Sequence, residues 1–278
     1  MRWQDRGTSS NVEDRRAGGG RRAAGLGLVG TLLLLVLSVV FQKNFFALTG
    51  TTPSLGGGAA PAATAPAKTD PAEERLVKFV SFVLDDVQAV WKTQFRKNNL
   101  RYQDARLVLF RGAVESACGF QKSAVGPFYC PADQKAYIDL SFYDELASRF
   151  GAPGDFAQAY VLAHEIGHHV QNLTGINTKV RQAQRANPRQ KNQLQVAMEL
   201  QADCYAGIWA HDTKRRNLLE QGDIEEGIGA AAAVGDDTIQ KKSRGYVVPE
   251  SFTHGSAKQR VEAFLKGFKS GDMQVCAF

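Results

Sequence analysis

The chain has 278 residues, of which 44% are hydrophobic, and its formal net charge is +6. This length allows one or two domains with apolar cores of ordinary size. Half of the charge excess lies in residues 1–22, where six arginines face three acidic residues, so the remainder of the chain carries only +3. A nearly balanced remainder argues against a nucleic-acid-binding surface, and we expect no nucleic acid among the partners.

Residues 1–22 are polar, rich in Arg and Gly and without hydrophobic periodicity, which predicts a disordered tail. Residues 23–42 include Ala23 to Phe41, a run of 19 residues without a charge that is long enough to span a bilayer. Because arginines precede this run, we expect a single-pass anchor with the tail in the cytoplasm and the rest of the chain in the periplasm or an equivalent space. The alternative is a cleaved signal peptide, whose apolar region would be shorter.

Residues 43–74, rich in Gly, Ala, Pro and Thr, are predicted to form a flexible linker. Residues 75–278 then form a single domain, which we expect to contain several helices. Apolar residues recur at helical spacing from Glu73 to Asn98. Gly and Pro signals bound further helices, one from Asp155 to Leu173 and one from about Pro188 to Arg216, and a third helix is expected from about Asp223 to Lys241. Short apolar runs predict strands at 105–110 and 135–140.

The four cysteines, at positions 118, 130, 204 and 276, form an even set. Outside the cytosol an even set predicts two disulfides, with three possible connectivities. We expect Cys118 to pair with Cys130, and Cys204 with Cys276. A zinc site made of cysteines is the alternative, but the chain has no C-x-x-C spacing.

The segment from His164 to His168 carries the pattern H-E-x-x-H. Residues four apart lie on one face of a helix, so His164 and His168 can bind one metal ion. Glu165 is rotated by about 100° around the helix, which places its carboxylate beside the metal as a candidate general base. Imidazole ligands suit a catalytic Zn²⁺, which takes three protein ligands and keeps one position open. The alternative, a surface helix with two unrelated histidines, fits poorly with the apolar residues around them.

A catalytic zinc ion needs a third ligand. Gln171 and Thr174 occupy the positions at which a metzincin motif would continue with Gly and His, so that class is excluded. Glu199 is the better candidate, and Asp203 lies on the same helical face, four residues later. We expect Glu199 to bind the metal and Asp203 to accept the spare ring N–H of His164. A solvated acidic helix face is the alternative, but apolar residues surround the pair.

These motifs in combination resemble the bacterial putative neutral zinc metallopeptidase family, and their H-E-x-x-H and E-x-x-x-D helices resemble the gluzincin peptidases more broadly. The resemblance covers about residues 75–278 and the N-terminal anchor. It rests on segments at Cys118–Gly119, Gly126–Pro131, Tyr137–Phe142, His164–Gln171, Glu199–Cys204 and Thr253–Ser256.

The resemblance implies an α+β domain that is mainly helical, with a zincin-like core and a small mixed sheet against the metal helix. It implies one Zn²⁺ per chain. It also supports a role in catalysis for His254, which could donate to a developing oxyanion; a capping or surface histidine is the alternative. In zincins a strand beside the metal helix pairs with extended substrate, and we expect residues 137–141 to do so. An ordinary covered strand is the alternative.

The predicted function is hydrolysis of peptide bonds in a peptide or protein substrate, by a membrane-anchored peptidase. Zinc lowers the pKa of bound water toward about 7, and Glu165 takes its proton. The alternative is a zinc-binding periplasmic scaffold or protein-interaction domain without turnover. Glu165 separates the two hypotheses, because a structural zinc site does not need a carboxylate beside an open position.

Overall fold

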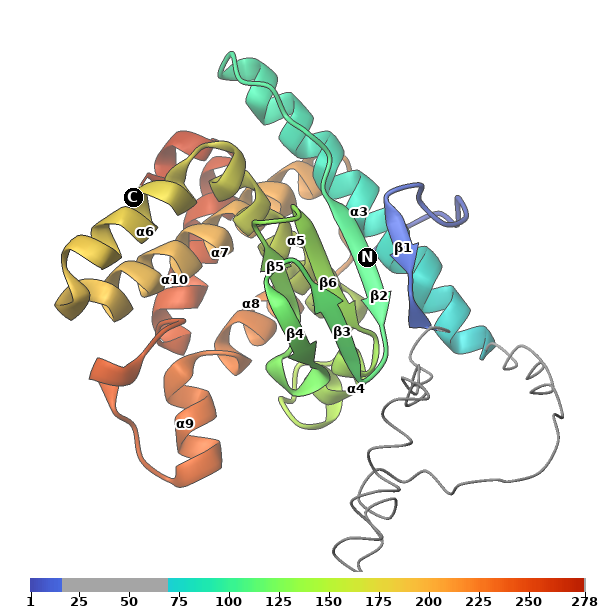
Figure 1. The fold of residues 1–278 in the computed structure, drawn as a ribbon. Helices are drawn as coiled ribbons and strands as arrows, with labels where there is room; N and C mark the ends of the chain where they lie inside the picture. The colour runs from blue at the N-terminus through green and yellow to red at the C-terminus, as the bar shows by residue number, and fades with distance from the viewer. Residues whose placement is uncertain (17–69, 278) are drawn as a thin grey trace, which may run out of the picture. The chain divides into compact units, whose positions relative to one another are not determined.

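The computed structural model describes residues 1–16 and 70–277, which belong to one folded unit (Figure 1). The predicted membrane segment at 23–42 and most of the predicted linker lie outside the described residues. Within the described part of the chain, no helix is both long and apolar enough to cross a membrane. The architecture is mainly helical with a small mixed sheet, as the sequence predicted.

The sheet has the strand order β1-β2-β6-β5. Strands β1 (Val12–Asp14), β2 (Arg106–Phe110) and β6 (Lys135–Asp139) run parallel, and β5 (Phe128–Cys130) pairs antiparallel with β6. The predicted strands at 105–110 and 135–140 are therefore confirmed as β2 and β6. Both are buried on two faces, one against the main core and one against a small cluster that includes Val114 of a hairpin, which is formed by β3 (Ala113–Ser116) and β4 (Gly119–Lys122).

The prediction of a disordered tail is wrong for residues 1–16. Strand β1 pairs with β2, Met1 is only 4% exposed, and the Trp3 ring packs at 5.5 Å from that of Phe79. Arg16 forms ion pairs with Glu73 and Glu74 at the start of the next helix. Composition gave the wrong prediction because a few apolar side chains are enough to fix a polar segment against the edge of a sheet.

The helices follow the predicted plan with two differences. A helix at 176–186 was not predicted. The helix expected at 223–241 is two helices, because the backbone is extended at Gly235 between them. The helices are α3 (Pro71–Lys97), α4 (Ser141–Ser148), α5 (Asp155–Leu173), α6 (Ile176–Ala186), α7 (Lys191–Arg215), α8 (Asp223–Ala233), α9 (Asp236–Arg244) and α10 (Ala257–Ser270).

Helices α5, α7 and α10 pack unusually close because glycines lie at their contacts. A Cβ on Gly167 of α5 would lie 3.0 Å from the backbone of Ala202 on α7. A Cβ on Gly267 of α10 would lie 1.9 Å from the carbonyl oxygen of Cys204, again on α7. Larger side chains would therefore force these helices apart. The close packing brings side chains of all three helices to one point.

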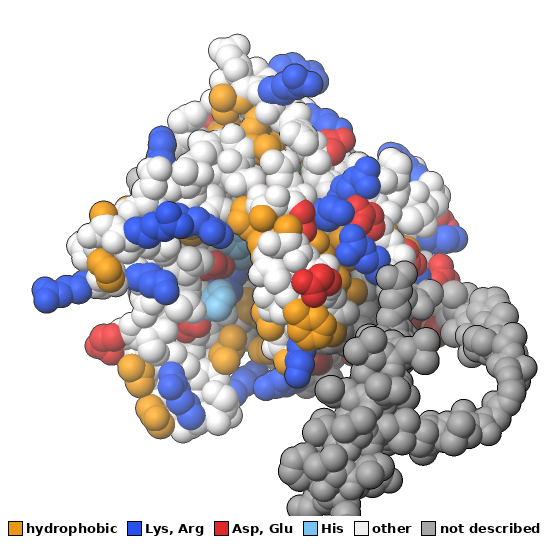
Figure 2. All heavy atoms as spheres, viewed as in Figure 1, with side chains coloured by type: hydrophobic (Ala, Val, Ile, Leu, Met, Phe, Trp, Pro, Cys, Tyr) orange, Lys and Arg blue, Asp and Glu red, His pale blue; other side chains and the backbone are white. Residues whose placement is uncertain are grey.

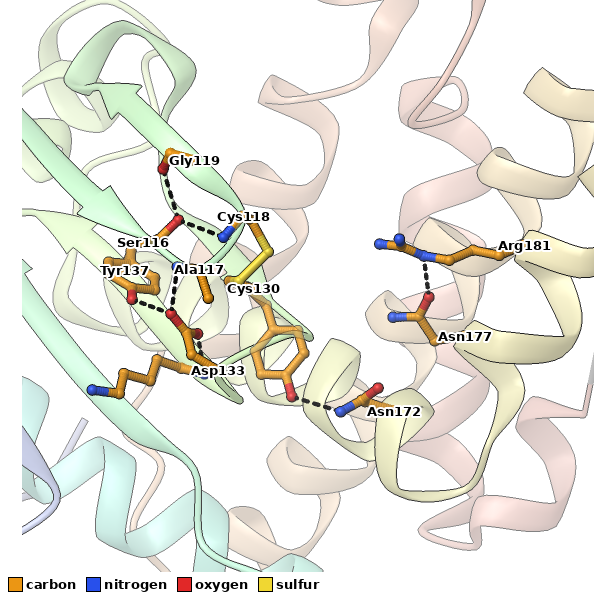
Figure 3. Close-up of a disulfide and its surroundings, with 12 residues drawn as sticks. Ser116, Ala117, Cys118, Gly119, Cys130, Asp133, Tyr137, Asn172, Asn177 and Arg181 are labelled. Atoms are coloured by element: carbon orange, nitrogen blue, oxygen red, sulfur yellow. Dashed lines mark hydrogen bonds between the residues drawn. A yellow bond between two sulfur atoms is a disulfide. The ribbon is translucent and has the colours of Figure 1, made fainter.

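Both predicted disulfides are present. Cys118, in the turn between β3 and β4, pairs with Cys130 of β5 (Figure 3). Cys204 of α7 pairs with Cys276 in the last turn of the described chain. The first bond fixes the hairpin to the sheet, and the second fixes the C-terminal segment to α7.

Candidate metal centre

Three side chains of metal-ligating type meet between α5 and α7. His164 and His168 extend from α5 and Glu199 from α7, and one donor atom of each lies within 4.8 Å of the others; we call these residues the metal cluster. Oε2 of Glu199 lies 3.2 Å from Nε2 of His164 and 3.5 Å from Nε2 of His168. Tetrahedral zinc with bonds of about 2.0–2.1 Å separates its ligand atoms by about 3.3 Å. The predicted ligands therefore fit a zinc ion in both spacing and donor type.

Each histidine of the metal cluster is held through its Nδ1 atom. Nδ1 of His164 lies 2.7 Å from Oδ1 of Asp203, as predicted, and Nδ1 of His168 lies 2.9 Å from Oε1 of Gln171. These acceptors favour an N–H at Nδ1, so that Nε2 keeps the lone pair that a metal requires. Gln171 is itself fixed, because its amide donates to the carbonyl oxygen of Met198 on α7.

Asp203 is the centre of a buried network that includes two residues the sequence analysis missed. The Arg260 guanidinium donates to both carboxylate oxygens of Asp203, at 2.8 and 2.9 Å, and the Tyr160 hydroxyl donates to Oδ1 at 2.5 Å. Burial would raise the pKa of Asp203, but Arg260 and His164 hold it at about 2. Asp203 therefore stays ionised and keeps His164 in one orientation.

The sequence did contain a signal for Arg260. It lies on the stripe of α10 that also buries Phe264 and Gly267, at the helical spacing of a core face. A charge on such a stripe needs a buried partner of opposite charge. The sequence alone does not identify Asp203 as that partner.

The carboxylates of the site create a negative potential that favours a cation. Burial would lower the pKa of His164, but Asp203 and Glu199 raise it to about 9. Burial would raise the pKa of Glu199, but the two histidines hold it well below its usual range. Glu165 differs from both, since burial raises its pKa above the usual range. A proton is therefore held more readily by Glu165 than by Glu199.

Glu165 and the metal cluster line a cleft with a volume of about 900 Å³. Its walls are the segment from 123 to 131, which includes β5, and helix α6 opposite. Figure 2 shows the hollow, with a histidine visible inside it. The described residues thus bring the predicted ligands and the predicted base together in one accessible cavity.

The sequence model of the family described as "Putative neutral zinc metallopeptidase" matches residues 1–278. The chain belongs to this family. Over 283 aligned residues it is 47% identical to the uncharacterized protein YpfJ of Escherichia coli (strain K12), covering 99% of this chain and 98% of that protein. It is 42% identical to the uncharacterized protein Rv2575 of Mycobacterium tuberculosis (strain H37Rv), covering 69% of this chain and 67% of that protein. No solved structure matches the chain.

In this family member, the predicted catalytic residue His254 lines the same cleft, but it lies on the rim and its side chain is 52% exposed. Its Nδ1 lies 3.2 Å from Oδ1 of Asp236, a residue that the sequence analysis missed. The other oxygen of Asp236 accepts backbone N–H groups of Thr253, His254 and Gly255 at 2.6–3.0 Å. Asp236 therefore fixes the loop, and the free edge of the imidazole is accessible from the cleft.

Proposed function

We propose that this family member is a zinc-dependent peptidase that hydrolyses peptide bonds, with Glu165 as general base. The position of Glu165 carries the proposal: it is 6% exposed, lines the cleft and adjoins the metal cluster, whose three residues would hold the zinc ion. A bound zinc ion would act as a Lewis acid toward the substrate carbonyl and the attacking water.

Glu165 accepts the proton of the attacking water and then delivers it to the leaving amine. Its raised pKa suits both steps, because a carboxylate with a pKa nearer to neutrality binds the proton more tightly and can still release it. Asp203 and Gln171 hold the two histidines in position during these transfers.

His254 is our candidate for stabilising the oxyanion that develops on the carbonyl. Its Nδ1 lies beside Oδ1 of Asp236, and an N–H at Nε2 would be the donor to the oxyanion. The Tyr160 hydroxyl also lines the cleft, but it donates to Asp203 and is not available for this role.

Strand β5 is a better candidate for pairing with substrate than residues 137–141. Strand β6 pairs with β2 along its whole length and with β5 from Lys135 to Tyr137, so Tyr137 is already paired on both sides, while pairing of substrate with residues 138–141 stays a prediction. Strand β5 ends the sheet, and its residues Phe128 and Tyr129 line the cleft. We propose that extended substrate adds to this edge through backbone hydrogen bonds.

We further propose that residues 23–42 attach the peptidase to the cell membrane. Because residues 1–16 and the site belong to one folded unit, we place both on the same side of the membrane. Residues 23–42 would then enter the bilayer without crossing it, in contrast to the single-pass anchor expected from the sequence. Ser10→Cys and Ser148→Cys would test this, since both positions are exposed and the four native cysteines are paired. We expect a membrane-impermeant thiol reagent to label both variants equally in spheroplasts; labelling of only one would support opposite sides.

The decisive experiment measures zinc and cleavage together. We expect the full chain, purified without chelators, to cleave a quenched peptide library, to lose this activity with a chelator and to regain it with zinc. Glu165→Gln should keep its zinc by elemental analysis while kcat/KM falls by about 10³-fold, as is typical for loss of a general base. Glu225→Gln, at an exposed position on α8, is the matched control. Stoichiometric zinc without cleavage of any peptide would favour the scaffold hypothesis.

A further inference from the structure

The two walls of the cleft differ in their chemistry. The wall formed by β5, the preceding loop and α4 is largely apolar, with Phe128 and Phe142 facing the cavity. The opposite wall, on α6 and the start of α7, carries Arg181, Arg185 and Lys191, which we call the basic wall. Figure 2 shows Lys and Arg side chains gathered beside the hollow in which a histidine is visible.

The charges of the basic wall are not neutralised by the protein. In the described part of the chain, no carboxylate lies within 4.0 Å of these three side chains, and residues 17–69 contain no Asp or Glu at all. Apart from Glu165 and Glu199, Glu145 is the only acidic residue among those described that lines the cleft, and it lies 3.7 Å from Arg149. The cleft therefore presents an excess of positive charge to any substrate that enters.

Arg181 is exposed, but a hydrogen bond orients its side chain. Its Nε atom donates at 2.9 Å to the side-chain oxygen of Asn177, which is 8% exposed and lines the same cleft. Figure 3 shows the Arg181 side chain extending from α6 toward the strand that carries Cys130. A guanidinium held in this way retains donors for a carboxylate inside the cleft.

The distance from the basic wall to the metal cluster suits a peptide. Lys191 precedes Glu199 by eight residues on α7, so it lies about 12 Å away along the helix axis. An extended peptide advances about 3.3 Å per residue. Lys191 would therefore meet a side chain three or four residues from the cleaved bond.

We propose that the basic wall selects peptides with Asp or Glu three or four residues from the cleaved bond, with apolar side chains on the opposite wall. This inference rests on the proposed peptidase function and names its substrate class. A solvated basic helix face would have the same composition, so the test compares residues inside and outside the cleft.

The experiment uses the zinc-loaded full chain and a peptide library whose cleavage products are sequenced by mass spectrometry. We expect Asp and Glu to be enriched over Asn and Gln by about tenfold at the third or fourth position on one side of the bond, the size expected from a few exposed ion pairs. The triple variant Arg181→Gln, Arg185→Gln, Lys191→Gln should lose the enrichment and still cleave neutral peptides.

The control variant Lys179→Gln, Arg189→Gln removes charge from the same segment at exposed positions that do not line the cleft. It should keep the enrichment. Two outcomes would overturn the inference and leave the peptidase function unaffected. In one, the unsubstituted chain cleaves peptides without an acidic preference; in the other, the control variant loses the preference as fully as the triple variant does.

A binding measurement separates the two proposals if no peptide is cleaved. Zinc-loaded Glu165→Gln would be titrated against two fluorescein-labelled peptides that differ only in Glu or Gln at every third position. We expect the Glu peptide to bind about tenfold more tightly at about 0.05 M salt, with the difference shrinking at about 0.5 M. Equal affinities would overturn the inference, whatever the cleavage result.

Discussion

Two groups of potential metal ligands lie along α5: the metal cluster, and an N-terminal cluster formed by Asp155, Asp223 and Glu226. Each brings its donor atoms within 4.8 Å of one another. In the N-terminal cluster, however, the protein itself supplies the positive partners. The α-amino group of Met1 lies 2.6 Å from Oδ1 of Asp155 and 3.2 Å from Oδ1 of Asp223, and Glu226 accepts the backbone N–H of Phe156.

The metal cluster has the opposite arrangement. Its protein partners, Asp203 and Gln171, lie behind the imidazoles and hold the Nδ1 atoms, so the Nε2 atoms converge without a hydrogen-bond donor between them. Proximity of ligand atoms therefore does not define a metal site. A metal site also needs side chains that orient its ligands. In the N-terminal cluster, acidic groups at the same spacing instead form an ion pair with an amine and cap a helix.

The largest effect that would separate the two clusters is on zinc content. We expect His164→Ala or Glu199→Ala to weaken zinc binding more than about 100-fold, since even residues behind the ligands cost 10–100-fold when removed. Asp223→Asn should leave one zinc per chain. Elemental analysis after dialysis checks both. Full zinc content in either ligand variant, or loss of zinc in Asp223→Asn, would reverse our assignment of the clusters.

The ligands were predictable because helical spacing is local. H-E-x-x-H fixes His164 and His168 within one turn, and E-x-x-x-D fixes Glu199 and Asp203 in the same way. Which helix faces which is not local, so Arg260 on α10 was missed. The pairing of Asp236 with His254 was missed for the same reason, because it joins α9 to a loop 18 residues later.

The strands also divide into features that the local sequence predicts and features that depend on long-range pairing. Apolar runs predicted β2 and β6 where the structure has them, but the pairing of Tyr137 with both β2 and β5 was not predicted, because strand order depends on pairing across the whole sheet. Strand β1 has only three residues in a polar, Arg-rich segment. The apolar contacts of this segment, through Met1, Trp3 and Val12, come from outside any periodic pattern.

An intermediate effect on zinc affinity is expected at Arg260. This residue supports the metal cluster through Asp203 and does not contact the atoms that would bind the metal. Arg260→Gln leaves the buried Asp203 carboxylate without its cation, so we expect about 3 kcal/mol less stability to unfolding and a 10–100-fold loss in zinc affinity. Arg260→Lys keeps the charge and should recover part of both. Urea unfolding and competition with a zinc indicator measure the two effects. Unchanged zinc affinity in a destabilised Arg260→Gln variant would limit Arg260 to a role in folding.

The smallest effect should come from the N-terminal cluster, as a dependence of stability on pH. Burial would lower the pKa of the Met1 α-amino group, but Asp155 and Asp223 raise it above its ordinary value of 8.0. The folded state therefore binds this proton more tightly than the unfolded state. The resulting stability is complete below pH 8 and is lost as the pH rises through the raised pKa. For such a pair we expect a loss of about 1 kcal/mol in the free energy of unfolding.

Urea unfolding of the zinc-loaded chain from pH 7 to pH 10 would measure this loss. Asp223→Asn should flatten the decline of stability with pH, because the amine then loses a charged partner. Parallel curves for the two proteins would mean that this amine contributes no stability, and that the N-terminal cluster is held by the backbone N–H groups of Phe156 and Glu220.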